Sequence, residues 1–484
     1  MTKVLNNLKP ALLWEVFEDI CGIPHPSKHE DALRAYVIAF ANKHGLESHV
    51  DEIGNVILRK AATPGMENKK GIIFQGHLDM VPQKNSSTVH DFLKDPIKPY
   101  IDGEWVTAED TTLGADNGIG VAAAMAIMAS DNIKHGPLEA LLTVDEEAGM
   151  GGAFALKPGL LKGDILINLD SEEEGELYVG CAGGIDTVAL FDYKEEAPKT
   201  THEAFELKIT GLKGGHSGMD IPLGRANANK LLFRFLYEAH QLDLCLSDVK
   251  GGTLRNAIPR EAFAVVTVPK DKSQDLQKLV KTYEDIFKNE FGSTEPELSF
   301  MLEKCEMPSS VMDAQTQKQV IWGVYGCPNG VMSMSTDMKD LVETSLNLAT
   351  VTTDSSKKTC EVVCLLRSSV DTAKHDLANM VTAVFELAGA KVTREGEYPG
   401  WKPNMDSEIL KSAQETYKQM FGKTPGIRAI HAGLECGLLG AVYPHWDMIS
   451  CGPTIKFPHS PDEKVHIASV EKFWDFLVKL TESV

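Results

Sequence analysis

Short apolar runs separated by helical patterns constrain the fold of this chain more than any other feature of its sequence. The run at residues 71–80 predicts a buried strand that delivers His77 near its end. Two similar runs follow at residues 138–144 and 164–169, and helical periodicity precedes them at residues 11–45. Strands that alternate with helices predict an α/β architecture with a largely parallel sheet, in which functional side chains collect where strands end.

A change of pattern divides the chain. From about residue 195, amphipathic strands alternate with amphipathic helices, which favours an α+β domain with one solvated sheet face. The first pattern returns after a segment with glycine and proline at residues 395–400. Because 484 residues exceed one ordinary core, we expect a discontinuous α/β domain at residues 1–193 and 398–484, interrupted by an α+β insertion at residues 194–397.

Composition excludes several classes of partner. Lysine and arginine number 48 against 69 aspartates and glutamates, so the formal net charge is −21, which argues against nucleic acid and anionic membranes as partners. No segment approaches the roughly 18 consecutive apolar residues of a membrane span, and the first residues lack a signal-peptide pattern. Nine scattered cysteines without a CxxC pair predict reduced thiols. We therefore expect a cytoplasmic protein.

Acids and histidines follow the apolar runs. Taken singly, each has an ordinary structural explanation, such as an N-cap or a solvated loop. Taken together they favour a metal site, because a parallel sheet places strand ends at one edge, where carboxylates repel unless cations neutralise them. Imidazole and carboxylate ligands without cysteine suit zinc, manganese or cobalt. The candidates are His77, Asp79, Asp116, Glu146, Glu147, Asp170 and His459.

The order and spacing of eight motifs resemble the M20 metallopeptidase family over essentially the whole chain, and within it the dipeptidases. These motifs are Gly76-His77-Leu78-Asp79, Leu113-Gly114-Ala115-Asp116-Asn117-Gly118, Asp145-Glu146-Glu147-Ala148-Gly149, Leu169-Asp170-Ser171-Glu172, Gly214-Gly215-His216-Ser217-Gly218, Arg255-Asn256-Ala257-Ile258-Pro259-Arg260, His431-Ala432-Gly433-Leu434-Glu435-Cys436-Gly437 and Pro458-His459-Ser460-Pro461. The resemblance implies that the α/β domain binds the metals and that the insertion acts as a lid and dimerises the protein.

The resemblance also implies a ligand set for two divalent ions, with Zn²⁺ first and Co²⁺ or Mn²⁺ as alternatives. Asp116 would bridge both ions. His77 and Asp170 would complete one site, and Glu147 and His459 the other.

Two acids next to these ligands would have different tasks. Asp79 would support the His77 imidazole. Glu146 would take a proton from a metal-bridging water and hand it to the leaving amine. The resemblance further implies a cis peptide bond between Asp116 and Asn117.

The insertion carries substrate-binding candidates. By resemblance, His216 reaches the developing oxyanion, from the partner subunit of a homodimer, and Asn256 is a second donor. Arg367 ends an apolar run and either clasps a substrate carboxylate or forms a salt bridge at the solvent edge. Gly433 is expected near the substrate carboxylate. The roles of His431 and Glu435 stay open.

The resemblance predicts hydrolysis of unblocked dipeptides, with a preference for Xaa-His substrates such as β-alanyl-histidine. One alternative is a related enzyme that acts on tripeptides or N-acyl amino acids, although an insertion of about 200 residues fits the dipeptidases better. Another is a non-catalytic protein that binds peptide or metal, against which the presence of Glu146 argues.

Overall fold

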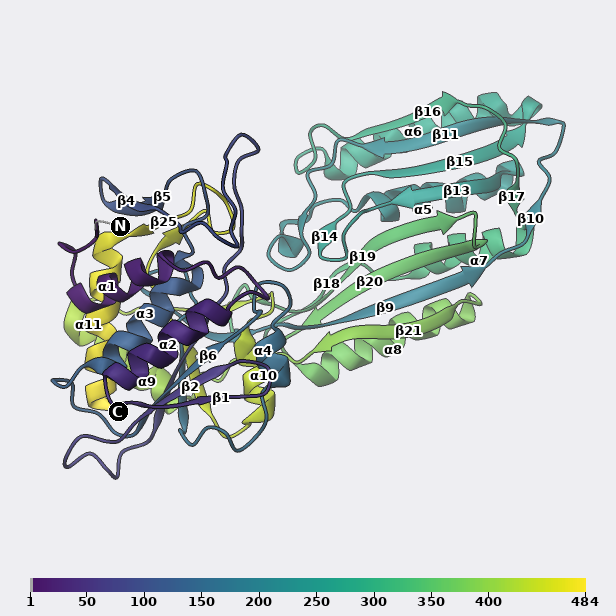
Figure 1. Ribbon diagram of the computed structural model, residues 1–484. Helices are drawn as coiled ribbons and strands as arrows, with labels where there is room; N and C mark the ends of the chain where they lie inside the picture. Colours follow the sequence, from purple (N-terminus) through teal and green to yellow (C-terminus); the bar gives the residue numbers. More distant parts are fainter. Residues whose placement is uncertain (1–2) are drawn as a thin grey trace. The chain divides into compact units, whose positions relative to one another are not determined.

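The computed structural model describes residues 3–484, which form two compact units (Figure 1). Unit 1 contains the residues up to Gly180 together with Pro403–Ala429 and Leu434–Val484. Unit 2 contains Cys181–Lys402 and the short segment Ile430–Gly433. Unit 1 is therefore discontinuous in sequence, with unit 2 inserted into it.

A mixed eight-stranded sheet forms the centre of unit 1, in the order β1-β2-β6-β3-β7-β23-β8-β22. The central strands β6, β3, β7 and β23 are parallel, whereas β1 and β2 on one side and β8 on the other pair antiparallel. The strands span Glu47–Val50 (β1), Val56–Lys60 (β2), Ile72–His77 (β3), Leu138–Thr143 (β6), Ile165–Asn168 (β7), Glu176–Cys181 (β8), Gly426–Ile430 (β22) and Asp447–Ser450 (β23). The predicted α/β class is confirmed.

Helices pack against this sheet (Figure 1). Helix α3 contacts β3 and β6, α2 contacts β1 and β2, and α9 contacts β23 and α11. Helix α1 lies against α3 and buries its apolar residues, as its helical periodicity predicted. The helices span Ala11–Cys21 (α1), Asp31–Lys43 (α2), Ala115–Ala129 (α3), Gly151–Ala155 (α4), Glu408–Phe421 (α9), Glu435–Val442 (α10) and Ile467–Ser483 (α11).

Local sequence explains where two of these helices begin. The Ser407 hydroxyl accepts the backbone N–H of Leu410 at 3.0 Å, so α9 starts directly after a side-chain cap. Helix α3 begins at Ala115, directly after its N-cap residue Gly114. Its first turn is irregular, because Asp116 and the residue after it have non-helical backbone angles.

A smaller four-stranded sheet anchors the C-terminal part of unit 1. Strands β4 (Pro99–Asp102) and β5 (Trp105–Ala108) form a hairpin that turns at Asp102-Gly103. Strand β25 (Lys464–His466) pairs with β5 and with β24 (Ile455–Lys456). The loop between β24 and β25 contains His459, so this sheet holds the loop against unit 1.

Unit 2 is built on a nine-stranded antiparallel sheet in the order β16-β11-β15-β13-β19-β20-β9-β21, with β18 beside β19. Helices α5 to α8 share one apolar core with the sheet. The long elements span Gly183–Asp192 (β9), His202–Thr210 (β11), Ala228–Ala239 (α5), Cys245–Gly251 (β13), Ala262–Pro269 (β15), Ser273–Phe291 (α6), Ser299–Lys304 (β16), Ala314–Gly326 (α7), Gly330–Met334 (β18), Val342–Asp354 (β19), Thr359–Ser368 (β20), Asp371–Leu387 (α8) and Lys391–Tyr398 (β21). Short elements are Glu195–Glu196 (β10), Gly215–His216 (β12), Ile221–Leu223 (η1), His240–Leu242 (η2), Ala257–Ile258 (β14), Lys270–Lys272 (η3) and Val311–Met312 (β17).

Apart from β18, the sheet of unit 2 and its helices consist of two halves with the same element order, strand–helix–strand–strand–helix–strand. One half contains β11, α5, β13, β15, α6 and β16, and the other contains β9, α7, β19, β20, α8 and β21. Their strand orders mirror each other, and the halves join where β13 pairs with β19. The first half is inserted between β9 and α7 of the second, so neighbouring strands can be far apart in the sequence.

The unit boundaries differ from the expected domain boundaries at 193/194 and 397/398. The reason is that β9 pairs with β20 and β21 and so belongs to the sheet of unit 2, although it precedes the change of sequence pattern.

None of the helices within residues 3–484 combines the length and apolar composition needed to cross a membrane. All nine cysteines lie in this range, and no disulfide links them.

Candidate metal centre

Three parallel strands bring their ends to one edge of the unit 1 sheet. The register places His77, the last residue of β3, opposite Thr143 at the end of β6, and Gln75 opposite Asn168 at the end of β7. Glu146 and Glu147 follow β6, and Asp170 follows β7. The edge that the alternating pattern predicted is therefore where the acids and the histidine collect.

The segment before helix α3 delivers Asp116 to the same edge. The peptide bond between Asp116 and Asn117 is cis, as the family resemblance implied. The Asn117 side chain accepts the backbone N–H of His77 at 3.3 Å and donates to the backbone carbonyl of Leu169 at 2.7 Å. The Asn117 side chain thus ties this segment to the ends of β3 and β7.

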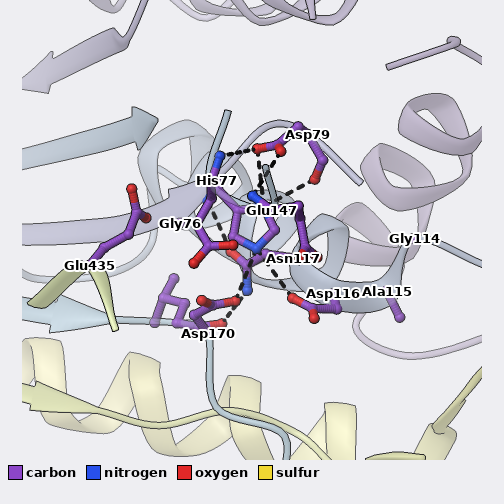
Figure 2. Close-up of polar contacts among 12 residues, drawn as sticks. Gly76, His77, Asp79, Gly114, Ala115, Asp116, Asn117, Glu147, Asp170 and Glu435 are labelled. Atoms are coloured by element: carbon purple, nitrogen blue, oxygen red, sulfur yellow. Dashed lines mark hydrogen bonds and ion pairs between the residues drawn. The ribbon is translucent and has the colours of Figure 1, made fainter. Parts of the chain in front are cut away.

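Two side-chain clusters share the Asp116 carboxylate. His77 Nε2 lies 3.2 Å from Asp116 Oδ1 and 3.3 Å from Asp170 Oδ1 (Figure 2). His459 Nε2 lies 3.2 Å from Asp116 Oδ2 and 3.0 Å from Glu147 Oε1. In each cluster one nitrogen or oxygen per residue lies within 4.8 Å of the others. The structure therefore gathers all five predicted metal ligands, with one oxygen of Asp116 directed to each cluster.

The His77 ring shows that a cation fits this site. Nδ1 lies 3.0 Å from the backbone carbonyl oxygen of Asp79, which can only accept, so the neutral ring carries its proton on Nδ1. The lone pair on Nε2 then faces the carboxylates of Asp116 and Asp170. Lone pairs that face each other require a proton or a cation between them. Imidazole and carboxylate donors without thiolate suit Zn²⁺, Mn²⁺ or Co²⁺.

The electrostatics of the metal-free cluster favour protons where a cation would bind. Burial lowers the pKa of His77, but the carboxylates of Asp170, Asp116 and Asp79 raise it well above its usual value. Hydrogen bonds to Asp116 and Glu147 raise the pKa of His459 to about 11. The raised pKa values favour the protonated form of both rings in the metal-free protein, and a cation must displace those protons.

Metal affinity should consequently rise with pH. Each proton released per bound ion is expected to strengthen binding by about tenfold per pH unit while pH stays below the raised pKa values of the two histidines. Calorimetric titration of metal-free protein with Mn²⁺ between about pH 6 and about pH 8 measures this slope. An affinity that stays constant over this range would show that His77 and His459 do not exchange protons for metal.

Asp79 supports more than the His77 ring. Its carboxylate accepts the backbone N–H of Glu146 at 2.9 Å and of Glu147 at 3.1 Å, and the hydroxyl of Ser27 at 2.8 Å. Burial raises its pKa, but the neighbouring His77 and these donors lower it to about 2. Asp79 is therefore an anion that fixes the turn containing Glu146 and Glu147.

Glu146 lies beside the two clusters. One of its oxygens lies within 4.8 Å of ligand atoms on His77 and Glu147. Burial and the carboxylates of Asp170, Glu435 and Glu147 raise its pKa well above the usual value, against the opposing effect of His77. A carboxyl group with a raised pKa can accept a proton and release it again.

A buried network lies under the metal centre, and the sequence left its central residue unassigned. The Glu435 carboxylate is 1% exposed and accepts the Gln75 amide at 2.5 Å and the Thr143 hydroxyl at 2.8 Å. Gln75 in turn accepts from the amide of Asn168 at 2.5 Å. Because all four residues lie at the strand ends or at the start of α10, the network fixes the sheet edge that carries the cluster.

Unit 2 contains a second group of predicted residues. Arg367 is buried, and its guanidinium donates to the Tyr398 hydroxyl at 2.8 Å and the Ser217 hydroxyl at 3.3 Å. The salt bridge at the solvent edge that was its alternative is absent among the described residues. The backbone N–H of Ser217 donates to the Asn256 carbonyl at 2.8 Å, while the Asn256 residue itself is exposed. His216, Asn256 and Arg367 are thus all neighbours of Ser217.

The His216 ring is oriented by its own turn. The backbone N–H groups of Gly218 and Met219 donate to His216 Nδ1 at 3.2 and 3.1 Å, so the proton of the neutral ring is on Nε2. Burial and the charge of Arg367 lower the pKa of His216, which favours this neutral form. His216 therefore presents an N–H donor.

The segment with His431 and Gly433 lies next to this turn. A Cβ atom on Gly218 would overlap the backbone carbonyl oxygen of His431, which explains the glycine at that position. His431 Nε2 lies 2.7 Å from the Ser345 hydroxyl. Burial and the nearby Arg367 lower the pKa of His431 to about 3, so its ring is neutral.

Comparison with known proteins gives independent evidence of the family of this chain. Residues 73–483 match the model of peptidase family M20/M25/M40. The chain is 52% identical over 482 residues to the cytosol non-specific dipeptidase of Escherichia coli strain K12, covering 99% of both chains. The crystal structure of aminoacylhistidine dipeptidase from Vibrio alginolyticus is 52% identical and has a TM-score of 0.94, covering 100% of this chain and 98% of that one.

More distant structures share the fold alone. Aminopeptidase PepT from Bacillus cereus is 16% identical with a TM-score of 0.56, covering 98% of both chains. Together, the family match, the full-length identity and the clusters at the sheet edge lead to one assignment: this chain belongs to the M20 peptidase family.

Proposed function

We propose that this protein is a metallo-dipeptidase that uses two divalent ions per chain, with zinc as the first candidate and cobalt or manganese as alternatives. Its substrates are unblocked dipeptides, with a preference for Xaa-His such as β-alanyl-histidine. The main support for this proposal is the pair of side-chain clusters that share the Asp116 carboxylate. The 52% identity to two dipeptidases over the full length supports the substrate class.

The proposed mechanism assigns a separate task to each side chain of unit 1. His77, Asp116 and Asp170 hold one ion, and Asp116, Glu147 and His459 hold the other. Bound divalent ions supply Lewis-acid polarisation of the scissile carbonyl and lower the pKa of water. The Glu146 carboxylate takes a proton from the attacking water and returns it to the nitrogen of the leaving amine.

Unit 2 supplies substrate-binding groups in this proposal. His216, reaching the site from the partner subunit of a homodimer, offers its Nε2–H to the carbonyl oxygen that becomes negatively charged, with Asn256 as a second donor. Arg367 binds the substrate carboxylate, together with the backbone at Gly433. This assignment is supported by the burial of the Arg367 guanidinium, which has no acid in direct ion-pair contact among the described residues and interacts with Asp186 only through space, because a buried charge without a direct counter-charge is costly.

The proposal extends to assembly and location. We propose that unit 2 acts as a lid and forms a homodimer interface, as the family resemblance implied. We place the protein in the cytoplasm, as the name of the Escherichia coli relative indicates for that protein.

A hydrolysis panel tests the proposed function. Purified protein is incubated with β-alanyl-histidine, an N-acetylated dipeptide and a tripeptide, each before and after chelation and after metal is restored. We expect hydrolysis of the free dipeptide only, lost on chelation and recovered with Zn²⁺, Co²⁺ or Mn²⁺. Faster cleavage of the tripeptide or the N-acyl substrate would favour the alternative enzymes, and absence of any turnover with metal bound would favour a binding protein.

A further inference from the structure

A buried acid outside the two clusters holds the segment that delivers Asp116. Glu463 is 2% exposed, and its carboxylate accepts four consecutive backbone N–H groups. Oε2 accepts from Leu113 at 2.8 Å and Gly114 at 3.0 Å, and Oε1 accepts from Ala115 at 2.8 Å and Asp116 at 3.2 Å. Both oxygens are therefore fully engaged with the backbone of one short segment.

These N–H groups depend on Glu463 because the local sequence offers no substitute. They precede or begin helix α3, where backbone N–H groups lack partners within the helix. The N-cap residue is Gly114, which has no side chain to accept them and adopts a left-handed conformation. A carboxylate from a distant part of the chain thus replaces the ordinary N-cap side chain.

The same acid is part of the loop that carries His459. The backbone N–H of Glu463 donates to the Ser460 carbonyl at 3.1 Å, which closes the turn after His459. The Glu463 carbonyl accepts the Thr107 hydroxyl at 2.7 Å, which fixes the loop to β5. Glu463 therefore links the backbone of Asp116 to the backbone that presents His459.

We propose that Glu463 is a positioning residue that sets the spacing between Asp116 and His459 and thereby the affinity of the ion held by Asp116, Glu147 and His459. The inference rests on the proposed two-ion centre. Loss of Glu463 frees two members of that cluster, Asp116 and His459, but only Asp116 of the other cluster. Binding of the ion held by Asp116, Glu147 and His459 is therefore weakened more than binding of the other ion.

The variant Glu463→Gln tests this role. The glutamine side chain has the same size, but its NH₂ group replaces one carboxylate oxygen. This NH₂ group faces two backbone N–H donors and cannot accept hydrogen bonds from them. Metal-free protein is titrated with Co²⁺ alone, and binding of each equivalent is followed by visible absorption. We expect the wild type to bind two equivalents, and the variant to bind one of them roughly 10- to 100-fold more weakly, in the range seen when groups behind metal ligands are removed. At saturating Co²⁺, kcat for β-alanyl-histidine should recover.

Glu139→Gln is the matched control in the same unit. Glu139 is 5% exposed and also accepts two backbone N–H groups, from Lys162 at 2.7 Å and Gly163 at 2.9 Å. Its variant should bind Co²⁺ like the wild type. Should Glu463→Gln fail to fold by circular dichroism, Glu463→Asp takes its place, because the shorter acid cannot reach all four donors.

The outcomes separate the two proposals. Selective weakening of one equivalent in the Glu463 variant supports its positioning role. Unchanged binding, or equal weakening in the Glu463 and Glu139 variants, overturns that role while the two-ion centre stands. A wild type that fails to bind two equivalents overturns the proposed centre itself.

Discussion

Replacing Glu146 by glutamine is expected to lower kcat by roughly 10²- to 10⁴-fold, the usual contribution of a general acid–base group. Glutamine keeps the size of the side chain but cannot take up a proton. Glu146 lies next to His77 and Glu147 without belonging to either cluster that shares Asp116. Two bound ions per chain should therefore remain in the variant, and KM should change little.

Metal analysis of the purified variant decides between two roles for Glu146. Loss of an ion together with turnover would show that Glu146 is a ligand and not the proton carrier. Asp145→Asn is a suitable neighbouring control, because Asp145 has φ of 56°, which asparagine tolerates, and belongs to neither cluster. This control should retain both metal and turnover.

Asp116→Ala should have the largest effect of any single substitution. Asp116 is the one residue common to both clusters, and its two oxygens face His77 and His459 at 3.2 Å each. Removing it leaves two ligand residues in each cluster. We expect both ions to be lost and kcat/KM to fall by roughly 10³-fold or more, because bound metal contributes several kcal/mol to the transition state.

His459→Ala provides the comparison for Asp116→Ala. His459 belongs to one cluster only, so this variant should lose one ion and keep the other. Metal content by plasma mass spectrometry after gel filtration measures both variants. An Asp116 variant that keeps one ion while the His459 variant loses both would show that the clusters do not share Asp116 as proposed.

The sequence predicted which side chains gather at the sheet edge, because that gathering follows from local patterns. Short apolar runs indicate where strands end, and parallel strands end at one edge of a sheet. These patterns alone predict that His77 and Asp170 lie close together, as they do in the structure. Glu463 illustrates what local patterns miss. Its bonds to Ala115 and Asp116 join residues more than 340 positions apart, and no periodicity predicts such a pairing.

The architecture of unit 2 was predicted only in outline for the same reason. Amphipathic strands and helices indicated an α+β insertion, but the mirrored order of its two halves depends on pairings such as β13 with β19 and β9 with β20. Strand β9 lies before the change of sequence pattern, and only its partners place it in unit 2. The sequence pattern therefore predicts the α+β class of the insertion, whereas its boundaries depend on strand pairings between residues that are far apart in the sequence.

Anomalous diffraction from crystals grown with Zn²⁺ shows whether each chain binds two ions that share Asp116. We expect two strong peaks per chain, one coordinated by His77 and Asp170, the other by Glu147 and His459, and both by Asp116. A single peak, or two peaks that share no carboxylate, would contradict this expectation.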